Sequence, residues 1–264
     1  MKKDSSPPGL ESDIDPSIAP SIGPSPGPAI NGRPGQSARA WGLWHAAAPI
    51  SALLFVAGFV LGSALRPPGL EGTAAGVLLL AIAVGLALVG RNARQRLGRH
   101  QRGAAGEEKV ARALETLPEG WHVFHGVPLF NRGDGGGKDA DHVVIGPNGI
   151  FLVETVNWTG RISVEAGEIL DQGKAYPGYT LEAIQSAAED LGELLAGAED
   201  NPPVVKPLFC AAGGRYAPGV TDRTDVIFRE PETLIETLLT PGRQTLTAAE
   251  VTRHALTLKA NIEI

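Results

Sequence analysis

Residues 138–162, KDADHVVIGPNGIFLVETVNWTGRI, limit most narrowly the structures that this chain can adopt. Two apolar runs, 142–145 and 150–153, flank the turn sequence GPNG at 146–149. Turn residues between two such runs predict a β-hairpin. If Gly146 pairs with Gly149, every other pair along the hairpin follows from that one.

Two carboxylates meet across the predicted hairpin. This register places Asp141 opposite Glu154 and Asp139 opposite Val156. Because side chains alternate along a strand, these four share one face, with the Cβ atoms of opposed residues about 5 Å apart. Opposed carboxylates repel one another unless a cation lies between them, and Mg²⁺ prefers oxygen ligands of this kind. The spacing therefore predicts that Asp141 and Glu154 hold Mg²⁺ or Mn²⁺.

The residues around this hairpin resemble a known family, the nuclease-related domain. Four segments carry the resemblance: GE at 106–107, DHVV at 141–144, GPNGIFLVE at 146–154 and NWTGRI at 157–162. The likeness extends over about residues 104–240. The family is related to the restriction-endonuclease-like PD-(D/E)xK nucleases, so the resemblance implies a mixed α/β sheet flanked by helices and metal-dependent cleavage of DNA or RNA.

The resemblance also implies roles for individual residues. Asp141 and Glu154 would be catalytic and would bind the metal, while Glu107 in the first helix and Gln185 on the helix after the core strands would be further catalytic residues. Glu107 is also compatible with a solvated acid in the first turn of a helix, where the helix dipole favours it, and Gln185 with an exposed helix residue. The family places a Lys two residues after the Glu, and this chain has Val156 there.

Two lysines could replace the missing ammonium: Lys138, which points to the opposite face of a regular strand, and Lys174, in a predicted loop. His142 faces away from Asp141, so we expect it to pack rather than to bind metal. The single cysteine, Cys210, excludes an internal disulfide and is expected to be a buried thiol in an apolar run.

The chain from residue 104 onward is acidic. Residues 104–264 hold 13 Lys and Arg against 24 Asp and Glu, a balance of −11. Nucleic-acid affinity comes largely from neutralised phosphates, so this charge opposes a simple nuclease. Two classes of function stay open: a metal-dependent nuclease of impaired or altered activity, and a catalytically inactive module that binds nucleic acid or a protein partner at the membrane.

Composition divides the chain into three parts. Residues 1–40 are rich in Pro, Gly and Ser and poor in large apolar side chains, so we expect them to be disordered. Residues 41–102 contain two apolar stretches, 43–65 and 73–90, each long enough to cross the roughly 30 Å hydrocarbon core of a bilayer as a helix. Residues 103–264 then form the nuclease-related domain with its C-terminal helices.

Basic residues predict the topology of the two spans. Five arginines follow the second apolar stretch and four Lys and Arg precede the first, whereas the connector holds one Arg and one Glu. By the positive-inside rule, both termini of a two-span protein of the cell membrane are cytoplasmic. The arginines could also contact nucleic acid, but beside a membrane span they ordinarily fix topology and attract anionic lipid.

Hydrophobic periodicity predicts the remaining elements. Helices are expected at 103–117, 180–196, 232–239 and 247–260, and strands at 121–127, 161–164, 204–210 and 225–228.

Overall fold

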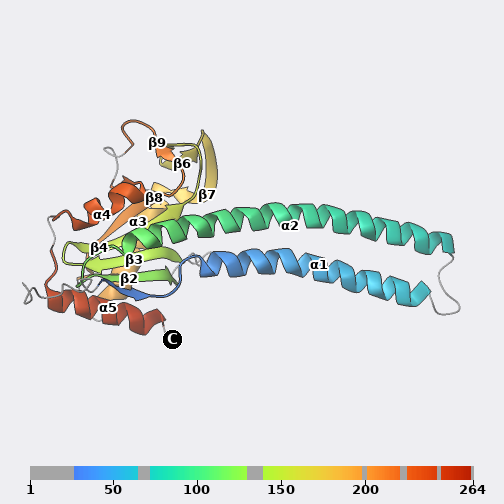
Figure 1. Ribbon diagram of the computed structural model, residues 1–264, viewed down its shortest axis with the longest axis horizontal. Helices are drawn as coiled ribbons and strands as arrows, with labels where there is room; N and C mark the ends of the chain where they lie inside the picture. Colours follow the sequence, from blue (N-terminus) through green and yellow to red (C-terminus); the bar gives the residue numbers. More distant parts are fainter. Residues whose placement is uncertain are drawn as a thin grey trace, which may run out of the picture.

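The computed structural model describes residues 27–64, 72–129, 139–197, 201–220, 225–242 and 245–262. It is a mixed α/β domain from which a long helical hairpin projects (Figure 1). The predicted class, a mixed sheet flanked by helices, is confirmed.

The larger sheet has six strands in the order β1-β2-β3-β4-β8-β10. They are β1 (Ala29–Asn31), β2 (His122–Val127), β3 (Ala140–Gly146), β4 (Gly149–Val156), β8 (Val205–Ala211) and β10 (Ile227–Arg229). The strands β2, β3 and β4 are antiparallel, whereas β8 is parallel to β4, β10 to β8, and β1 to β2. All eight residues of β4 are buried, which is why its apolar run is almost continuous rather than alternating.

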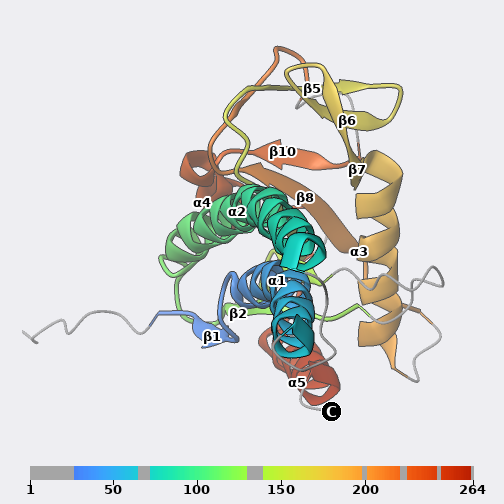
Figure 2. The ribbon, with the colours of Figure 1, turned by 90° about the vertical axis from the view of Figure 1, so that its right-hand side faces the viewer.

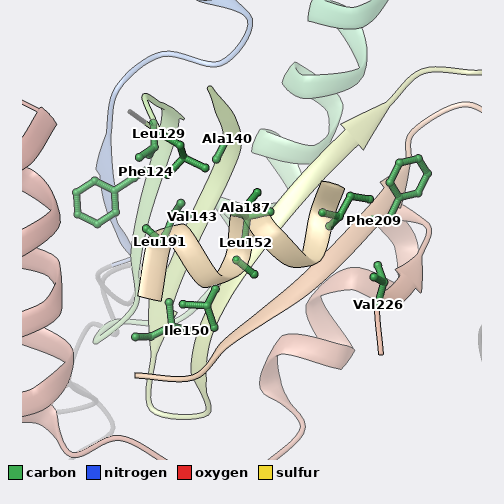
Figure 3. Close-up of a cluster of buried hydrophobic side chains, with 14 of the residues drawn as sticks. Phe124, Leu129, Ala140, Val143, Ile150, Leu152, Ala187, Leu191, Phe209 and Val226 are labelled. Atoms are coloured by element: carbon green, nitrogen blue, oxygen red, sulfur yellow. The ribbon is translucent and has the colours of Figure 1, made fainter. Parts of the chain in front are cut away.

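Helices cover both faces of this sheet. The α2 face is covered by α2 (Gly72–Leu114) and α4 (Pro231–Leu239), and the α3 face by α3 (Leu181–Ala196) and α5 (Ala248–Ile262). Figure 3 shows the core on the α3 face, where Leu191 and Ala187 of α3 lie over Val143, Ile150 and Leu152 of the hairpin. Burying side chains of this size contributes about 1.5–3 kcal/mol each, so this packing fixes the hairpin against α3.

A second, smaller sheet has the order β7-β6-β5-β9 and lies to one side of the domain, near the start of α3 (Figure 2). Its strands are β5 (Arg161–Glu165), β6 (Glu168–Asp171), β7 (Lys174–Thr180) and β9 (Arg215–Tyr216). The strand expected at 161–164 is therefore present, but it belongs to this sheet rather than to the larger one. Residue pairs with positive φ make the tight turns, Ala166–Gly167 and Gln172–Gly173, as two-residue hairpin loops require.

The structure describes the N-terminal segment from residue 27. The predicted disorder of residues 1–40 is therefore wrong for residues 27–40. Strand β1 pairs with the edge of β2, and the Ala29 N–H donates to the Trp121 carbonyl at 2.9 Å. The ladder of β2 supplies the backbone partners that this short segment lacks by itself. Residues 1–26 lie outside the described part of the chain.

The helical hairpin consists of α1 (Gln36–Ala64) and α2, which run side by side (Figures 1 and 2). The 43 residues of α2 form one continuous helix, about 65 Å long. It joins three segments that the sequence predicts separately: the second apolar stretch, the arginine-rich flank and the first helix of the domain. Within the residues that the structure describes, no helix combines the length and the hydropathy needed to cross a membrane.

Candidate functional site

The β3–β4 hairpin has the predicted register. Gly146 pairs with Gly149, and the pairing continues to His142 and Val153. Beyond that pair, the Thr155 N–H donates to a carboxylate oxygen of Asp141 at 2.7 Å. Continued pairing would have given this N–H to the main-chain oxygen of residue 140. The Asp141 side chain therefore takes the place of a ladder hydrogen bond, at the point where the two strands separate.

At this separation the Asp141 carboxylate is bound to the N–H of Thr155, the residue that follows Glu154. We call Asp141 and Glu154 the carboxylate pair. Glu154 is buried, with 2% of its surface exposed, whereas Asp141 is half-buried. Glu154 lies on the same face of β4 as Leu152 and Val156, because residues two apart on a strand share a face. Those two side chains belong to the core of the α3 face. Glu154 thus lies at the end of that core, and the predicted pairing of Glu154 with Asp141 stays a prediction.

The donor set of the carboxylate pair fits a hard divalent cation. Both side chains offer only oxygen, and Mg²⁺ is usually bound through one or two protein carboxylates, with waters and substrate phosphates as its other ligands. Among the described residues, no three His, Cys, Asp or Glu side chains converge on a common point. Asp141 and Glu154 are therefore the two ligands that the described residues would offer to such an ion.

Glu107 has a structural contact of its own. It is buried on α2, and its carboxylate accepts the N–H of Gly35 at 2.8 Å. Because Gly35 directly precedes α1, this bond ties the start of α1 to α2. The catalytic role that the resemblance implies for Glu107 stays a prediction.

Gln185 lines an open depression of about 590 Å³ between α3 and the residues around the start of β8. Pro203, Val205 and Asp225 also line it. The role of Gln185 in catalysis likewise stays a prediction.

The two lysines considered as replacements for the missing ammonium have different outcomes. Lys138 lies outside the described residues, and the Lys174 ammonium lies 5.0 Å from the centroid of the Tyr176 ring. Sequence reasoning missed a third cation, Lys109 on α2. Its ammonium donates to the Ala212 carbonyl at 3.0 Å, and the Ala212 N–H donates to the Val156 carbonyl at 2.7 Å.

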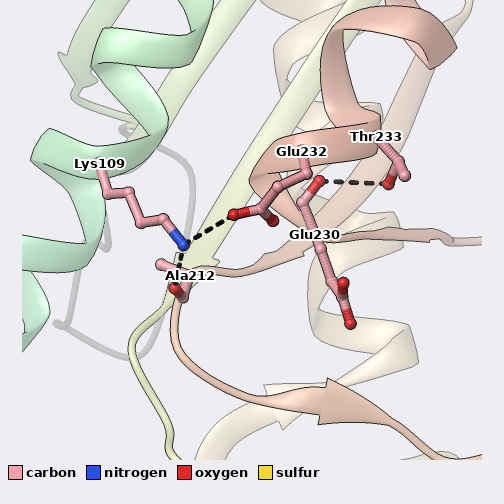
Figure 4. A network of polar contacts seen from close by, with 5 residues as sticks. All are labelled: Lys109, Ala212, Glu230, Glu232 and Thr233. Carbon is pink, nitrogen blue, oxygen red and sulfur yellow. Dashed lines mark hydrogen bonds and ion pairs between the residues drawn. The ribbon is translucent and has the colours of Figure 1, made fainter.

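Lys109 is also paired with a carboxylate. Its ammonium lies 3.1 Å from an Oε1 atom of Glu232 at the start of α4 (Figure 4). The backbone N–H of Glu232 itself and then Lys109 lower the pKa of the Glu232 carboxyl. Lys109 therefore links α2, α4 and the end of β8, and its charge is directed to that junction.

Two histidines form a buried pair on the α2 face, opposite to the face of Asp141. His125 and His142 are partners across β2 and β3, and their Nδ1 atoms lie 2.7 Å apart. Burial lowers the pKa of His125 to about 4, and burial and then His125 hold the pKa of His142 well below its usual value. Both rings are therefore neutral at pH 7, with one Nδ1 donating and the other accepting. His142 packs away from the carboxylate pair, as expected.

Cys210 is buried on the same face. Burial and then the nearby Glu232 raise the pKa of its thiol to about 12. A thiol that stays protonated at neutral pH is a poor nucleophile, so the expected structural role of Cys210 fits its surroundings.

The sheet, the helices on its two faces and the carboxylate pair define a mixed α/β domain with an acidic site at the separation of two central strands. Residues 102–211 match the family model described as the nuclease-related domain. The match ends with the last residue of β8, so it includes the hairpin, the carboxylate pair and α3.

Similarity to curated proteins is local. An uncharacterized protein of Bacillus anthracis is 40% identical over 62 residues, which span 23% of this chain and 29% of that protein. No solved structure matches this chain.

Proposed function

We propose that the domain binds Mg²⁺ or Mn²⁺ through Asp141 and Glu154 and cleaves DNA or RNA with impaired activity. The observation that carries this proposal is the carboxylate pair at the separation of β3 and β4. A divalent cation held there would polarise a phosphoryl oxygen and neutralise the charge that develops on it. The nuclease relationship of residues 102–211 supports this class of reaction.

Asp141, Glu154 and Val156 have different parts in the proposed site. Asp141 has one carboxylate oxygen fixed by the Thr155 N–H, which orients the group before any ligand arrives. Glu154 is held on a fully buried strand, so its carboxylate moves little. Val156 provides neither a positive charge nor a hydrogen bond, so the transition state lacks the stabilisation that an ammonium would give.

A second function is favoured by Val156 itself. With 3% of its surface exposed, Val156 packs in the core of the α3 face rather than facing an open site. This packing supports a catalytically inactive module that binds nucleic acid or a protein partner. The two functions differ in their response to metal, because only the first requires the carboxylate pair to bind it.

Metal binding is tested by thermal unfolding of the full-length protein in detergent, with and without millimolar Mg²⁺ or Mn²⁺. A ligand at a hundred times its Kd stabilises a protein by about 2.7 kcal/mol, so the melting temperature should rise. Asp141→Asn and Glu154→Gln should each abolish the rise, and Glu165→Gln, a matched change of an exposed acid on β5, should keep it. A wild-type melting temperature that metal leaves unchanged would contradict the metal site.

We also propose that the α1–α2 hairpin attaches the protein to the cell membrane, with both termini in the cytoplasm. Large apolar side chains are exposed along both helices: Trp44, Leu54, Phe55, Val56, Phe59, Leu61, Val77, Leu80, Val84 and Leu88. Phe55, for example, is 78% exposed. An apolar surface of this extent ordinarily contacts lipid or another protein, and the flanking basic residues favour anionic lipid.

Membrane attachment is tested by alkaline extraction of membranes from cells that make the full-length protein. Wild type should stay in the membrane pellet, and a Phe55→Glu, Phe59→Glu double variant should be released in part. Leu256→Glu is the control, because this exposed apolar side chain lies on α5, away from the hairpin. A reporter fused after Ile264 should be active in the cytoplasm, and an externally accessible C-terminus would contradict the proposed topology.

A further inference from the structure

An aromatic stack adjoins Phe209, the residue of β8 that is paired with Glu154. The rings of Trp158 and Tyr176 are stacked, with centroids 5.1 Å apart and planes 28° from parallel. The Lys174 ammonium lies over the Tyr176 ring, 5.0 Å from its centroid. We call Trp158, Tyr176 and Lys174 the aromatic platform. None of the three was predicted to bind a ligand by stacking.

The position of the platform follows from the strand register. Trp158 comes four residues after Glu154, and its ring lies 5.9 Å from the ring of Phe209. Phe209 on β8 is the register partner of Glu154 on β4. Trp158 therefore adjoins the residue next to Glu154, and at about 3.3 Å per residue the Cα atoms of Trp158 and Glu154 are at most about 13 Å apart.

The aromatic platform packs on the core of the α3 face on one side and is accessible to solvent on the other. Trp158 also contacts Tyr179 edge-on, at 5.2 Å between centroids, and packs against the core of the α3 face. Trp158 and Tyr176 are half-buried, whereas Lys174 is exposed. The core thus fixes the orientation of the rings, which lowers the entropy lost when a ligand stacks on them. The exposed Lys174 can leave the Tyr176 ring without leaving a buried group unpaired.

The part of the domain that contains the smaller sheet is less acidic than the rest of the domain. Residues 157–180 and 212–217, which contain the smaller sheet, hold three basic residues and three acidic ones: Arg161, Lys174 and Arg215 against Glu165, Glu168 and Asp171. Their net charge is zero, so the remainder of residues 104–264 carries the whole balance of −11. A polyanion is therefore repelled less at the platform than over the rest of the domain.

We propose that the aromatic platform binds an unpaired nucleobase of a single-stranded DNA or RNA, with Lys174 moving to a neighbouring phosphate. This inference rests on the proposed action on nucleic acid and adds the class of substrate. An unpaired base presents a free π-face, which aromatic side chains bind irrespective of sequence. Bases within a duplex are already stacked, so the platform selects single strands.

The test measures binding of the full-length protein in detergent by fluorescence anisotropy, with EDTA present so that no cleavage occurs. The probes are a labelled oligo(dT) of 20 nucleotides, an abasic strand of the same length and phosphate charge, and a duplex of 20 base pairs. Stacking contributes about 1–3 kcal/mol per base, so the abasic strand should bind about 5- to 150-fold more weakly than oligo(dT). The duplex should also bind more weakly than oligo(dT).

Two variants locate the binding on the platform. Tyr176→Leu keeps an apolar side chain but removes the ring, and it should weaken oligo(dT) binding to a similar extent with little change in binding of the abasic strand. Lys174→Gln should reduce the slope of log affinity against log salt by about 0.7, the value for one phosphate contact on a single strand. Lys259→Gln, an exposed lysine of α5, is the matched control and should leave that slope unchanged.

The outcomes separate this inference from the proposed function. If wild type binds oligo(dT) and the abasic strand equally well, or binds the duplex as tightly, the platform is refuted while nucleic-acid binding stands. If Tyr176→Leu keeps its melting temperature and its full affinity for oligo(dT), stacking takes place elsewhere and the platform is again refuted. If wild type binds none of the three probes, action on nucleic acid fails and the platform fails with it.

Discussion

Val156→Lys should raise metal-dependent cleavage of nucleic acid by about 10²- to 10³-fold over wild type. One charge-stabilising contact to a transition state typically contributes about 3 kcal/mol or more, which corresponds to this factor. Val156 is the position at which the resemblance implies a catalytic lysine, two residues after Glu154 on the same face of β4. Burying an unpaired ammonium is costly, but the Glu154 carboxylate offers it a partner.

The matched control is Val156→Met, which also lengthens the buried side chain but adds no charge. It should leave cleavage at the wild-type level, so that a gain in Val156→Lys reports the ammonium rather than repacking of the core. The measurement is release of a fluorescent fragment from a labelled oligonucleotide in Mn²⁺. No gain in a Val156→Lys variant that folds and still binds metal would favour the inactive binding module.

The same substitution at two glycines of α2 should have opposite effects on stability. A Cβ atom at Gly106 would lie 2.7 Å from the Cβ of Asn157 and 3.4 Å from that of Ala212. Neither of these atoms can turn away, because each is attached directly to the backbone. Gly106→Ala should therefore push α2 from the sheet and destabilise the protein by about 1–3 kcal/mol, despite the better helix propensity of Ala.

Gly103→Ala is the matched control on the same helix. Nothing lies within 4 Å of a Cβ at Gly103, so this change should stabilise the protein by about 0.5–1 kcal/mol. Thermal unfolding of both variants measures the contrast, about 1.5–4 kcal/mol in total. Equal melting temperatures would mean that α2 does not approach Asn157 as closely as the structure shows.

The hairpin and its register could be predicted because local features determine both. A two-residue loop fixes which residues pair, and the alternation of side chains then fixes which of them share a face. The predicted pairing of Asp141 with Glu154 rests on the same rule. The helices on the two faces follow from the 3.6-residue period of their apolar positions in the same way.

Other features lack a local signal. Strand β1 has three residues within a Pro- and Gly-rich segment, and only the edge of β2 makes it a strand. The smaller sheet alternates charged with apolar residues over short strands, so its pattern is weak. The bond from Lys109 to Ala212 joins residues 103 positions apart, and no spacing rule connects residues so distant in the chain.

The unbroken course of α2 determines how the domain can be oriented. Fifteen residues, 91–105, separate the apolar part of α2 from Gly106, a rise of about 22 Å without a joint. Each residue added to or removed from this segment would rotate the sheet by about 100° around the helix axis and shift it by about 1.5 Å. The length of this helix therefore sets how far the carboxylate pair lies from the apolar part of the α1–α2 hairpin. It also sets the direction in which the pair faces around the helix axis.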